Sequence, residues 1–293
     1  MPPVQVQAEV LSVRRTGAYV QITLVAPGIA ERTRPGHFLA VQVGGPESSM
    51  LLRRAFALYD VKERGLYGGT VEFVFAVHGR GTAWLADRRP QDKVDVVGPL
   101  GKPFRLPKEP VTATLVGGGY GSAPLLPLAA ALRARGGKVH TVLGAAGKDR
   151  LFGQLEAKRA SSSLTVTTDD GSTGERGRVT DVLPALLERT GTQVVYACGP
   201  MAMLRAVAEL AEERGLPSQV AVEESMACGI GVCMTCVLPV VGDDGLTRMV
   251  RSCVEGPVFL GDRVRWADVG AVPADAVGAL AAAPTAAPTA GLV

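Results

Sequence analysis

Four of the five cysteines in the chain lie close together in its C-terminal third. Cys228, Cys233 and Cys236 follow the spacing C-x4-C-x2-C, and Cys253 comes after sixteen further residues. Plant-type ferredoxins use the same tight spacing to hold a 2Fe-2S cluster. Glycines between the cysteines allow the loop to wrap a small cluster and aim backbone N–H groups at its sulfurs. We therefore predict that these four cysteines are the ligands of a 2Fe-2S cluster.

Other uses of the cysteines stay open at this point. A structural zinc site usually has two C-x2-C pairs or includes histidine. This chain has one C-x2-C pair, and His37, His78 and His140 are all distant in sequence. The same distance disfavours a Rieske cluster, and simple buried thiols are the blandest alternative. Cys198 lies apart from the other four cysteines in sequence, and we expect it to be a small buried residue at the end of a strand.

A glycine-rich segment, "VGGGYGSAPL", suggests a nucleotide site. Gly117, Gly118, Gly119 and Gly121 lie where a predicted strand meets a predicted helix, so their backbone could approach a pyrophosphate at the helix N-terminus. The register differs from G-x-G-x-x-G, and a plain tight turn is the alternative. Because a 2Fe-2S cluster carries single electrons and nicotinamides exchange hydrides, a chain with both needs a converter, which is usually a flavin.

Three patterns along the chain predict the elements that position these residues. Residues 4–100 alternate with period two between Gly and Pro turns, which predicts a small antiparallel β-barrel. From about residue 111, strands alternate with helices, which predicts a parallel α/β sheet. We expect a flavin-binding barrel at 1–107, a nucleotide-binding α/β domain at 108–222, a cluster region at 223–270 and a disordered Ala/Pro-rich tail at 271–293.

Composition excludes several classes of function. Net charge is +3, 20% of residues are charged and 47% are hydrophobic, which is typical of a globular protein without a basic surface for nucleic acid. The longest apolar stretches are too short to span a membrane, and the N-terminus lacks the pattern of a secretory leader. We expect a cytoplasmic protein that binds neither nucleic acid nor membrane.

Several motifs in the same order make the chain resemble the ferredoxin reductase superfamily. Over residues 4–265 it is similar to the electron-transfer subunits of type 1B dihydroorotate dehydrogenase. The motifs are "LLRRAFALYD", "GRGTAWL", "GPLGKPF", "VGGGYGSAPLLPLA", "TDDGSTGERGRVTDVL", "YACGPMAML", "ESMACGIGVCMTCV" and "RSCVEGPVF". The resemblance implies FAD, a 2Fe-2S cluster and NAD as cofactors.

The resemblance also implies flavin-binding residues in the barrel. The stretch from Arg54 through Phe56 to Ala57 matches an Arg-Pro-x-Ser signature in which the arginine pairs with FAD phosphate and the serine reaches the flavin ring. Arg54 fits its role, although a surface arginine is the alternative, whereas Ala55 and Ala57 replace the proline and serine. "GRGT" resembles the pyrophosphate turn, with Gly79, Gly81 and Thr82 as donors. Structurally it is also a helix start with Thr82 as N-cap.

On the nicotinamide side, the resemblance implies backbone donors at Gly118, Gly119 and Gly121. It also implies a Cys-Gly-Pro turn near the flavin at Cys198, Gly199 and Pro200, which is equally a well-formed helix start. Asp169 and Asp170 either contact a ribose or only turn the chain. After the strand "VHTVLGAAGKDR", Lys148 and Arg150 suit an extra phosphate but Asp149 repels one, and the family preference favours NADH.

The function implied is electron transfer. A separate FMN-containing catalytic subunit oxidises dihydroorotate in pyrimidine (UMP) biosynthesis, and this chain passes the electrons through its cluster and FAD to NAD, with no catalytic residue for the pyrimidine chemistry. The implied assembly has two catalytic and two electron-transfer subunits, joined through an apolar surface near the cluster. Alternatives are a flavin/iron-sulfur subunit of a sulfhydrogenase, a ferredoxin:NADP oxidoreductase or an oxygenase system, and a non-redox, zinc-stabilised binding module.

Overall fold

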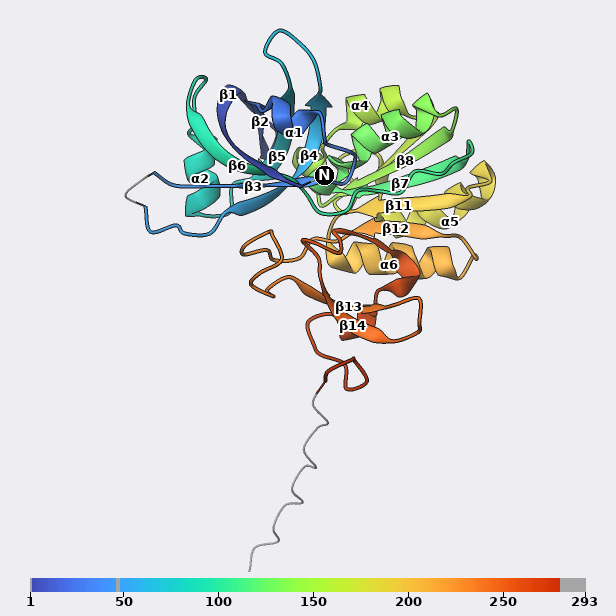
Figure 1. Ribbon diagram of the computed structural model, residues 1–293. Coiled ribbons are helices and arrows are strands. Elements are labelled where there is room, and N and C mark those ends of the chain that lie inside the picture. The colour runs from blue at the N-terminus through green and yellow to red at the C-terminus, as the bar shows by residue number, and fades with distance from the viewer. Residues whose placement is uncertain (1, 46–47, 280–293) are drawn as a thin grey trace, which may run out of the picture.

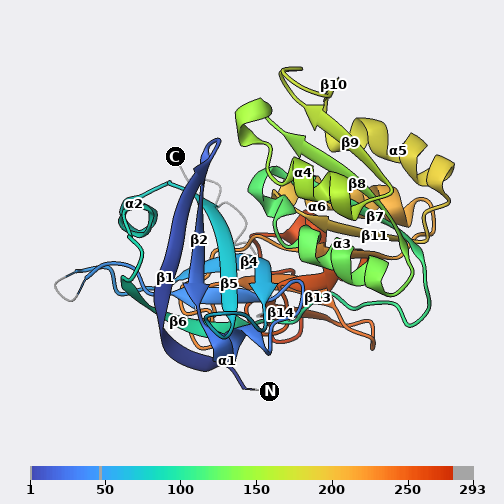
Figure 2. The same ribbon diagram turned by 90° about the horizontal axis from the view of Figure 1, so that it is seen from above.

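The N-terminal part of the protein is a closed six-stranded barrel. The computed structural model describes residues 2–45 and 48–279. The barrel order is β1-β2-β5-β4-β3-β6, with every neighbouring pair antiparallel (Figures 1 and 2). Its strands are β1 (Val4–Thr16), β2 (Tyr19–Val25), β3 (Phe38–Val41), β4 (Arg54–Lys62), β5 (Thr70–Ala76) and β6 (Lys93–Leu100), with the short helices α1 (Pro27–Ala30) and α2 (Arg80–Ala86). The predicted barrel is confirmed.

Alternation along the strands builds the barrel core. Ile22, Phe73 and Val96 are fully buried members of one cluster that fills the barrel, while their sequence neighbours face outward. Phe56 and Phe73 stack inside it with ring centroids 4.8 Å apart. The period of two in the sequence therefore sets which side chains of each strand remain available for a ligand.

The central part is a seven-stranded sheet in the order β10-β9-β8-β7-β11-β12-β15. All neighbours are parallel except β12 and β15. The strands are β7 (Thr112–Gly118), β8 (Lys138–Ala145), β9 (Ser163–Thr168), β10 (Glu175–Arg176), β11 (Val194–Cys198), β12 (Ser218–Ala221) and β15 (Val258–Leu260). The predicted parallel α/β sheet is confirmed, and a strand from the cluster region completes its edge.

Helices cover both faces of this sheet (Figures 1 and 2). They are α3 (Leu125–Ala134), α4 (Gln154–Ala160), α5 (Val179–Thr190) and α6 (Met201–Glu212). Consecutive residues of β7 separate the two cores: Leu115 packs with the buried side of α3, and Val116 packs with α5 and α6. Burial on both faces explains the nearly continuous apolar runs in the sequence of these strands.

The C-terminal region adds a two-stranded hairpin of β13 (Val237–Val241) and β14 (Thr247–Arg251). Residues 275 and 277, which the sequence placed in a disordered tail, make defined contacts. Arg265 Nη1 donates to Asp275 Oδ1 at 2.6 Å, and Val277 N donates to Thr247 O at 2.8 Å. The chain therefore packs against β14 up to about residue 279, and the remainder of the predicted tail, 280–293, lies outside the described residues. Within the described part, no helix has the length and apolar character needed to cross a membrane.

The buried His37, just before β3, makes stability depend on pH. Its Nδ1 accepts a hydrogen bond from Arg34 N at 3.0 Å, and burial, together with Arg34, lowers its pKa to about 4. Between pH 6.5 and pH 4 the unfolded chain therefore binds a proton at His37 that the folded chain does not. The stabilising contribution of neutral His37 is complete above pH 6.5 and is lost as the pH falls from 6.5 to 4.

We expect His37→Asn to reduce the fall in unfolding free energy between pH 7 and pH 5, measured by urea titration at both values. Asparagine keeps a hydrogen-bond acceptor but cannot take up the proton. A variant whose free energy falls as steeply as that of the wild type would assign the pH dependence to other groups.

Candidate functional site

A cavity of about 340 Å³ lies where the barrel meets the carboxyl edge of the sheet. Its residues from the barrel are Gly36, Phe38, Arg54, Ala55, Phe56, Ala57, Val74, Phe75, Ala76, His78 and Thr82. Its residues from the rest of the chain are Tyr120, Gly121, Ala123, Pro124, Cys198, Gly199, Ala221, Val222, Glu223, Glu224, Met226 and Pro257. We call it the flavin cavity, because it unites the flavin-binding stretches predicted from the sequence.

Arg54, the first residue of β4, lies at the barrel side of this cavity. Its Nη1 donates to Leu52 O at 2.8 Å, which fixes the guanidinium beside its own strand. Arg53 instead forms an ion pair with Asp95 at 2.6 Å on the barrel. A Cβ on Gly81 would lie 3.3 Å from Arg54 Nε and 3.0 Å from a Val43 methyl, so the glycine lets the helix start approach the arginine. The structure thus brings Arg54 and the "GRGT" turn together.

The "GRGT" turn begins α2, but its cap differs from the expectation. Gly79 is the N-cap, and Thr82 is the third helical residue. The Thr82 hydroxyl accepts hydrogen bonds from the backbone N–H of His78 at 3.0 Å and Gly79 at 3.1 Å. Those bonds occupy two donors at the turn, so a ligand here would meet the Thr82 side chain and the remaining backbone N–H groups.

The three residues after Arg54 alternate in direction. Ala55 and Ala57 are exposed toward the cavity, whereas the Phe56 side chain packs inside the barrel. Phe56 can therefore offer a ligand only its backbone. The missing hydroxyl at Ala57 leaves an apolar wall there, and no other hydroxyl of β4 replaces it at this cavity.

A second cavity, of about 500 Å³, lies at the carboxyl edge of the parallel sheet, and we call it the nicotinamide cavity. The strand order reverses between β7 and β11, and ligands of open α/β sheets bind beyond the strand ends at such a switch point. The glycine turn after β7 and Pro200 after β11 lie there. The lining residues are Tyr19, Gly118, Gly119, Tyr120, Gly121, Gly144, Ala145, Ala146, Arg150, Thr167, Asp169, Arg178, Val179, Thr180, Pro200, Ala202, Met203, Ala206 and Glu223.

The turns after β7 and β11 interlock. A Cβ on Gly121 would lie 2.7 Å from Gly199 Cα, and one on Gly118 would lie 2.8 Å from Pro200 Cδ. Gly199 itself has φ +156° and also packs against Gly118. Only glycine allows the two backbones to meet this closely at the junction of the two cavities.

We expect Gly121→Ala to weaken NAD⁺ binding by about tenfold or more, because the new methyl group must push apart backbone atoms at 2.7 and 2.9 Å. Calorimetric titration of the purified protein with NAD⁺ measures it. Gly28→Ala in α1 is the matched control, because its Cβ would meet only a Val4 methyl group at 3.8 Å. It should bind NAD⁺ like the wild type. Equal affinity in both variants would contradict the assigned role of Gly121.

Some of the residues predicted from the sequence line a cavity, and others only stabilise the turns beside it. Asp169 lines the nicotinamide cavity, whereas Asp170 accepts a hydrogen bond from Ser172 N at 2.9 Å in the turn after β9. Arg150 lines the cavity, while Lys148 and Asp149 do not. Burial, with Glu223 nearby, raises the pKa of Cys198 to about 12, so its thiol stays protonated beside the flavin cavity.

The sequence did not reveal four side chains at these cavities: Tyr120, Arg178, Glu223 and Glu224. Tyr120 sits inside the predicted glycine turn, but its aromatic character carried no signal of a site. Arg178 immediately precedes α5, and the two glutamates follow β12. Their places at strand and helix ends at this edge of the sheet are the pattern that could have identified them.

The hairpin explains how Cys236 and Cys253 meet across sixteen residues. Cys236 directly precedes β13 and Cys253 follows β14. Ser252 N donates to Cys236 O at 2.8 Å, which continues the strand pairing. The two cysteines are buried and belong to one apolar cluster with Phe38 of the barrel. Strand pairing thus brings together one pair of the predicted ligands.

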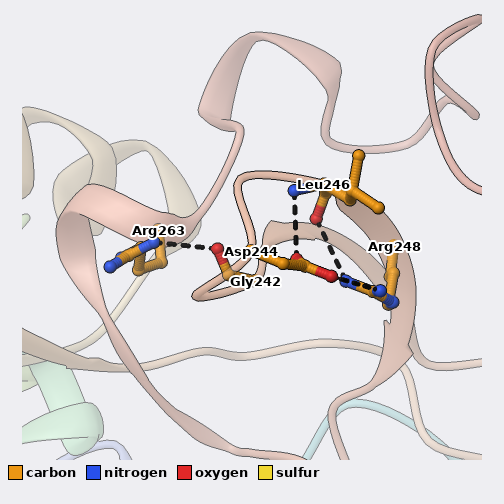
Figure 3. Close-up of polar contacts among 5 residues, drawn as sticks. All are labelled: Gly242, Asp244, Leu246, Arg248 and Arg263. Atoms are coloured by element: carbon orange, nitrogen blue, oxygen red, sulfur yellow. Dashed lines mark hydrogen bonds and ion pairs between the residues drawn. The ribbon is translucent and has the colours of Figure 1, made fainter.

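An ionic turn closes the far end of this hairpin (Figure 3). Asp244 Oδ1 accepts hydrogen bonds from Leu246 N at 3.1 Å and from Arg248 Nη1 at 2.9 Å. Arg248 holds the pKa of Asp244 below its usual range. Arg263 Nη1 donates to Gly242 O at 2.9 Å and ties the turn to the segment after β15. These contacts fix the register on which the Cys236–Cys253 pair depends.

Cys228 and Cys233 form the second pair, on an exposed loop. Hydrogen bonds from Thr235 and from Cys228 lower the pKa of Cys233 to about 6. Cys228 Sγ accepts a hydrogen bond from Val232 N at 3.4 Å. Within the described part of the chain, no three cysteine, histidine or acidic side chains converge as ligands of one metal ion. The C-x4-C-x2-C spacing is what favours a 2Fe-2S cluster over a single zinc ion here.

Comparisons with known families agree with this arrangement. Residues 223–265 match the family model "Iron-sulfur cluster binding domain of dihydroorotate dehydrogenase B", and residues 115–209 match "Oxidoreductase NAD-binding domain". The chain is 42% identical, over 82% of its length and 90% of the relative's, to the electron transfer subunit of dihydroorotate dehydrogenase B (NAD(+)) from Bacillus caldolyticus. It is 38% identical, over 93% and 97%, to the probable subunit of the same name from Methanopyrus kandleri. The iron-sulfur match replaces the zinc alternative.

Solved structures share the fold. One is the structure of an NADH-dependent reduced ferredoxin-NADP oxidoreductase, described in relation to flavin-based electron bifurcation. It is 32% identical to this chain, the alignment covers 90% of this chain and 91% of that one, and the TM-score is 0.77. The cytochrome b5 reductase domain of Ulva prolifera nitrate reductase is 17% identical, covers 73% and 94%, and has a TM-score of 0.58, which shows the fold alone. With these similarities over most of its length, the chain belongs to the family of dihydroorotate dehydrogenase B (NAD⁺) electron transfer subunits.

Proposed function

We propose that this chain transfers electrons from an FMN-containing dihydroorotate dehydrogenase catalytic subunit to NAD⁺, as one of two electron-transfer subunits in a complex with two catalytic subunits. The observation that supports it best is that three sites follow one another: Cys236 and Cys253 pack against Phe38, which lines the flavin cavity, and the flavin cavity shares Gly121 with the nicotinamide cavity. When bound, FAD exchanges single electrons with a 2Fe-2S cluster and hydride with NAD.

The residues of this chain then bind, orient and shield. Arg54 and the start of α2 would hold the FAD phosphates through charge-assisted and backbone hydrogen bonds. Gly118, Gly119 and Gly121 would let the dinucleotide approach the ends of β7 and β11. The cavity wall at Ala55 and Ala57 is apolar, which excludes water from the flavin ring.

The loop that carries Cys228 and Cys233 supports a docking role at the cluster. Ile230 is 52% exposed, Val232 76% and Met234 52%, all without a charged residue between them in sequence. Apolar side chains gathered on an exposed loop mark a surface that a partner covers. We propose that the catalytic subunit docks there, which places its donor close to the cluster.

The test is anaerobic purification and a visible spectrum before and after addition of NADH, with NADPH as comparison. Flavin bands on a broad iron-sulfur absorption that bleach with NADH, and dihydroorotate-dependent NADH formation once the catalytic subunit is added, are the expected results. Bleaching without any dihydroorotate activity would instead favour the ferredoxin-NADP oxidoreductase alternative, which the 32% identical structure keeps as the second candidate.

A further inference from the structure

The flavin and nicotinamide cavities have three residues in common: Tyr120, Gly121 and Glu223. Gly121 has no side chain, so the partition between the cavities consists of the Tyr120 ring and the Glu223 carboxylate. Tyr120 Oη donates to Glu223 Oε1 at 2.8 Å and closes the partition. Hydride transfer requires nicotinamide C4 to come within contact of flavin N5, and a closed partition would separate the two rings.

From these contacts, we propose that Tyr120 is a gate whose ring must leave the partition before nicotinamide reaches the flavin, and that its hydrogen bond to Glu223 holds the gate closed. This inference rests on the proposed function. It makes Tyr120 a positioning residue, because the free energy needed to move its ring reduces the apparent affinity for NAD⁺.

The surroundings of Tyr120 restrict the motion to its side chain. Gly121 is packed against Gly199 on one side, and Gly119, at φ +56°, passes close to the Tyr19 hydroxyl on the other. Tyr19 is itself fixed, because its hydroxyl donates to Arg150 O at 2.7 Å. With the backbone held at both neighbours, rotation of the Tyr120 side chain is the available way to open the partition.

The Tyr120 ring is partly buried and packs at the edge of the apolar cluster that includes Tyr19 and Phe152. Tyr120 meets Tyr19 edge-on with centroids 5.4 Å apart, and its hydroxyl has the single partner Glu223. Burial, together with Glu223, raises the pKa of Tyr120, so its hydroxyl remains a protonated donor at neutral pH. The hydrogen bond to the Glu223 carboxylate and the packing of the ring together restrain opening, and the bond is the part that a single substitution can remove.

The experiment compares NAD⁺ with ADP-ribose, which fills the nicotinamide cavity but carries no nicotinamide ring. A ligand that binds only a minor conformation has an apparent affinity reduced in proportion to the population of that conformation. A closed gate should therefore lower the affinity for NAD⁺ but not the affinity for ADP-ribose. Tyr120→Phe keeps the ring and removes the donor. We expect it to bind NAD⁺ about tenfold more tightly by calorimetry, with unchanged affinity for ADP-ribose.

Three further variants sharpen the test. Tyr120→Ala, which removes the ring, should show at least the same tightening for NAD⁺. Glu223→Gln should tighten NAD⁺ binding less than Tyr120→Phe, and the double variant should match Tyr120→Phe, because both changes remove one interaction. Tyr196→Phe is the matched control: its hydroxyl donates to Arg105 O far from both cavities, and Gln219 also donates to that oxygen.

Parallel changes for NAD⁺ and ADP-ribose, or unchanged NAD⁺ affinity in Tyr120→Phe, would overturn the gate. Tightening in Tyr120→Ala alone would overturn the role of the Glu223 bond. A wild-type protein that binds neither ligand would instead contradict the proposed function, so the two failures are distinguishable.

Discussion

Cys253→Ser is expected to abolish the 2Fe-2S absorption and the electron paramagnetic resonance signal of the reduced cluster while leaving FAD bound and reducible by NADH. Cys253 is 2% exposed and lies with Cys236 in the apolar cluster at the end of the hairpin, so its thiol is held in place by packing. A serine hydroxyl is a much poorer iron ligand than a thiolate. Electron transfer from the catalytic subunit should fall by at least a hundredfold, since the flavin would lose its donor.

Cys198→Ser provides the matched control, because the chain has five cysteines and the fifth lies away from the cluster pairs. It should keep the full iron and sulfide content of the wild type. Loss of the cluster in Cys198→Ser, or its retention in Cys253→Ser, would contradict the ligand set. Iron analysis of both proteins, with circular dichroism to verify folding, decides between these outcomes.

The sequence was informative wherever chemistry depends on local spacing. Three of the predicted cluster ligands lie on one short loop, and the glycines of the predicted nucleotide turn lie at one strand-to-helix junction, so neighbours in sequence are neighbours in space. The barrel was predictable for a related reason. Each of its strands pairs with antiparallel partners and buries one face, which imposes a period of two on the sequence.

What the sequence could not show depends on contacts between distant segments. Tyr120 and Glu223 meet only because β7 and β12 end at the same edge of the sheet on either side of β11. The hairpin that joins Cys236 to Cys253 depends on the ionic turn at Asp244, whose aspartate and arginine resemble ordinary surface residues in sequence. Such pairings follow from topology, and no local pattern encodes them.

The predicted flavin residues show a third limit. A motif match placed four consecutive residues in the flavin site, but strand alternation divides them, because Phe56 faces the barrel core while Ala55 and Ala57 face the cavity. A family signature gives positions, and the strand geometry decides which of those positions present a side chain to a ligand.

Arg54→Ala is expected to raise the dissociation constant of FAD about a hundredfold, which corresponds to about 2.7 kcal/mol. The guanidinium is held beside the start of α2 by Leu52 O, and it is the one cation among the side chains that line the flavin cavity in the described part of the chain, apart from the titratable His78. Without it, the negative phosphates would rely on backbone N–H groups alone.

Fluorescence titration of the flavin-free protein with FAD measures this change at two salt concentrations. Arg64→Ala is the control, because Arg64 is exposed in the β4–β5 loop and lines neither the flavin cavity nor the nicotinamide cavity. It should leave the affinity for FAD unchanged. Arg54→Lys should recover only part of the loss, because an ammonium group keeps the charge but cannot bind two phosphate oxygens in a fixed plane. The affinity of Arg54→Ala should also depend less on salt than that of the wild type, since the screened attraction is gone. Full recovery in Arg54→Lys would mean that Arg54 contributes charge alone, and an unchanged Arg54→Ala would place the FAD phosphates elsewhere on the barrel.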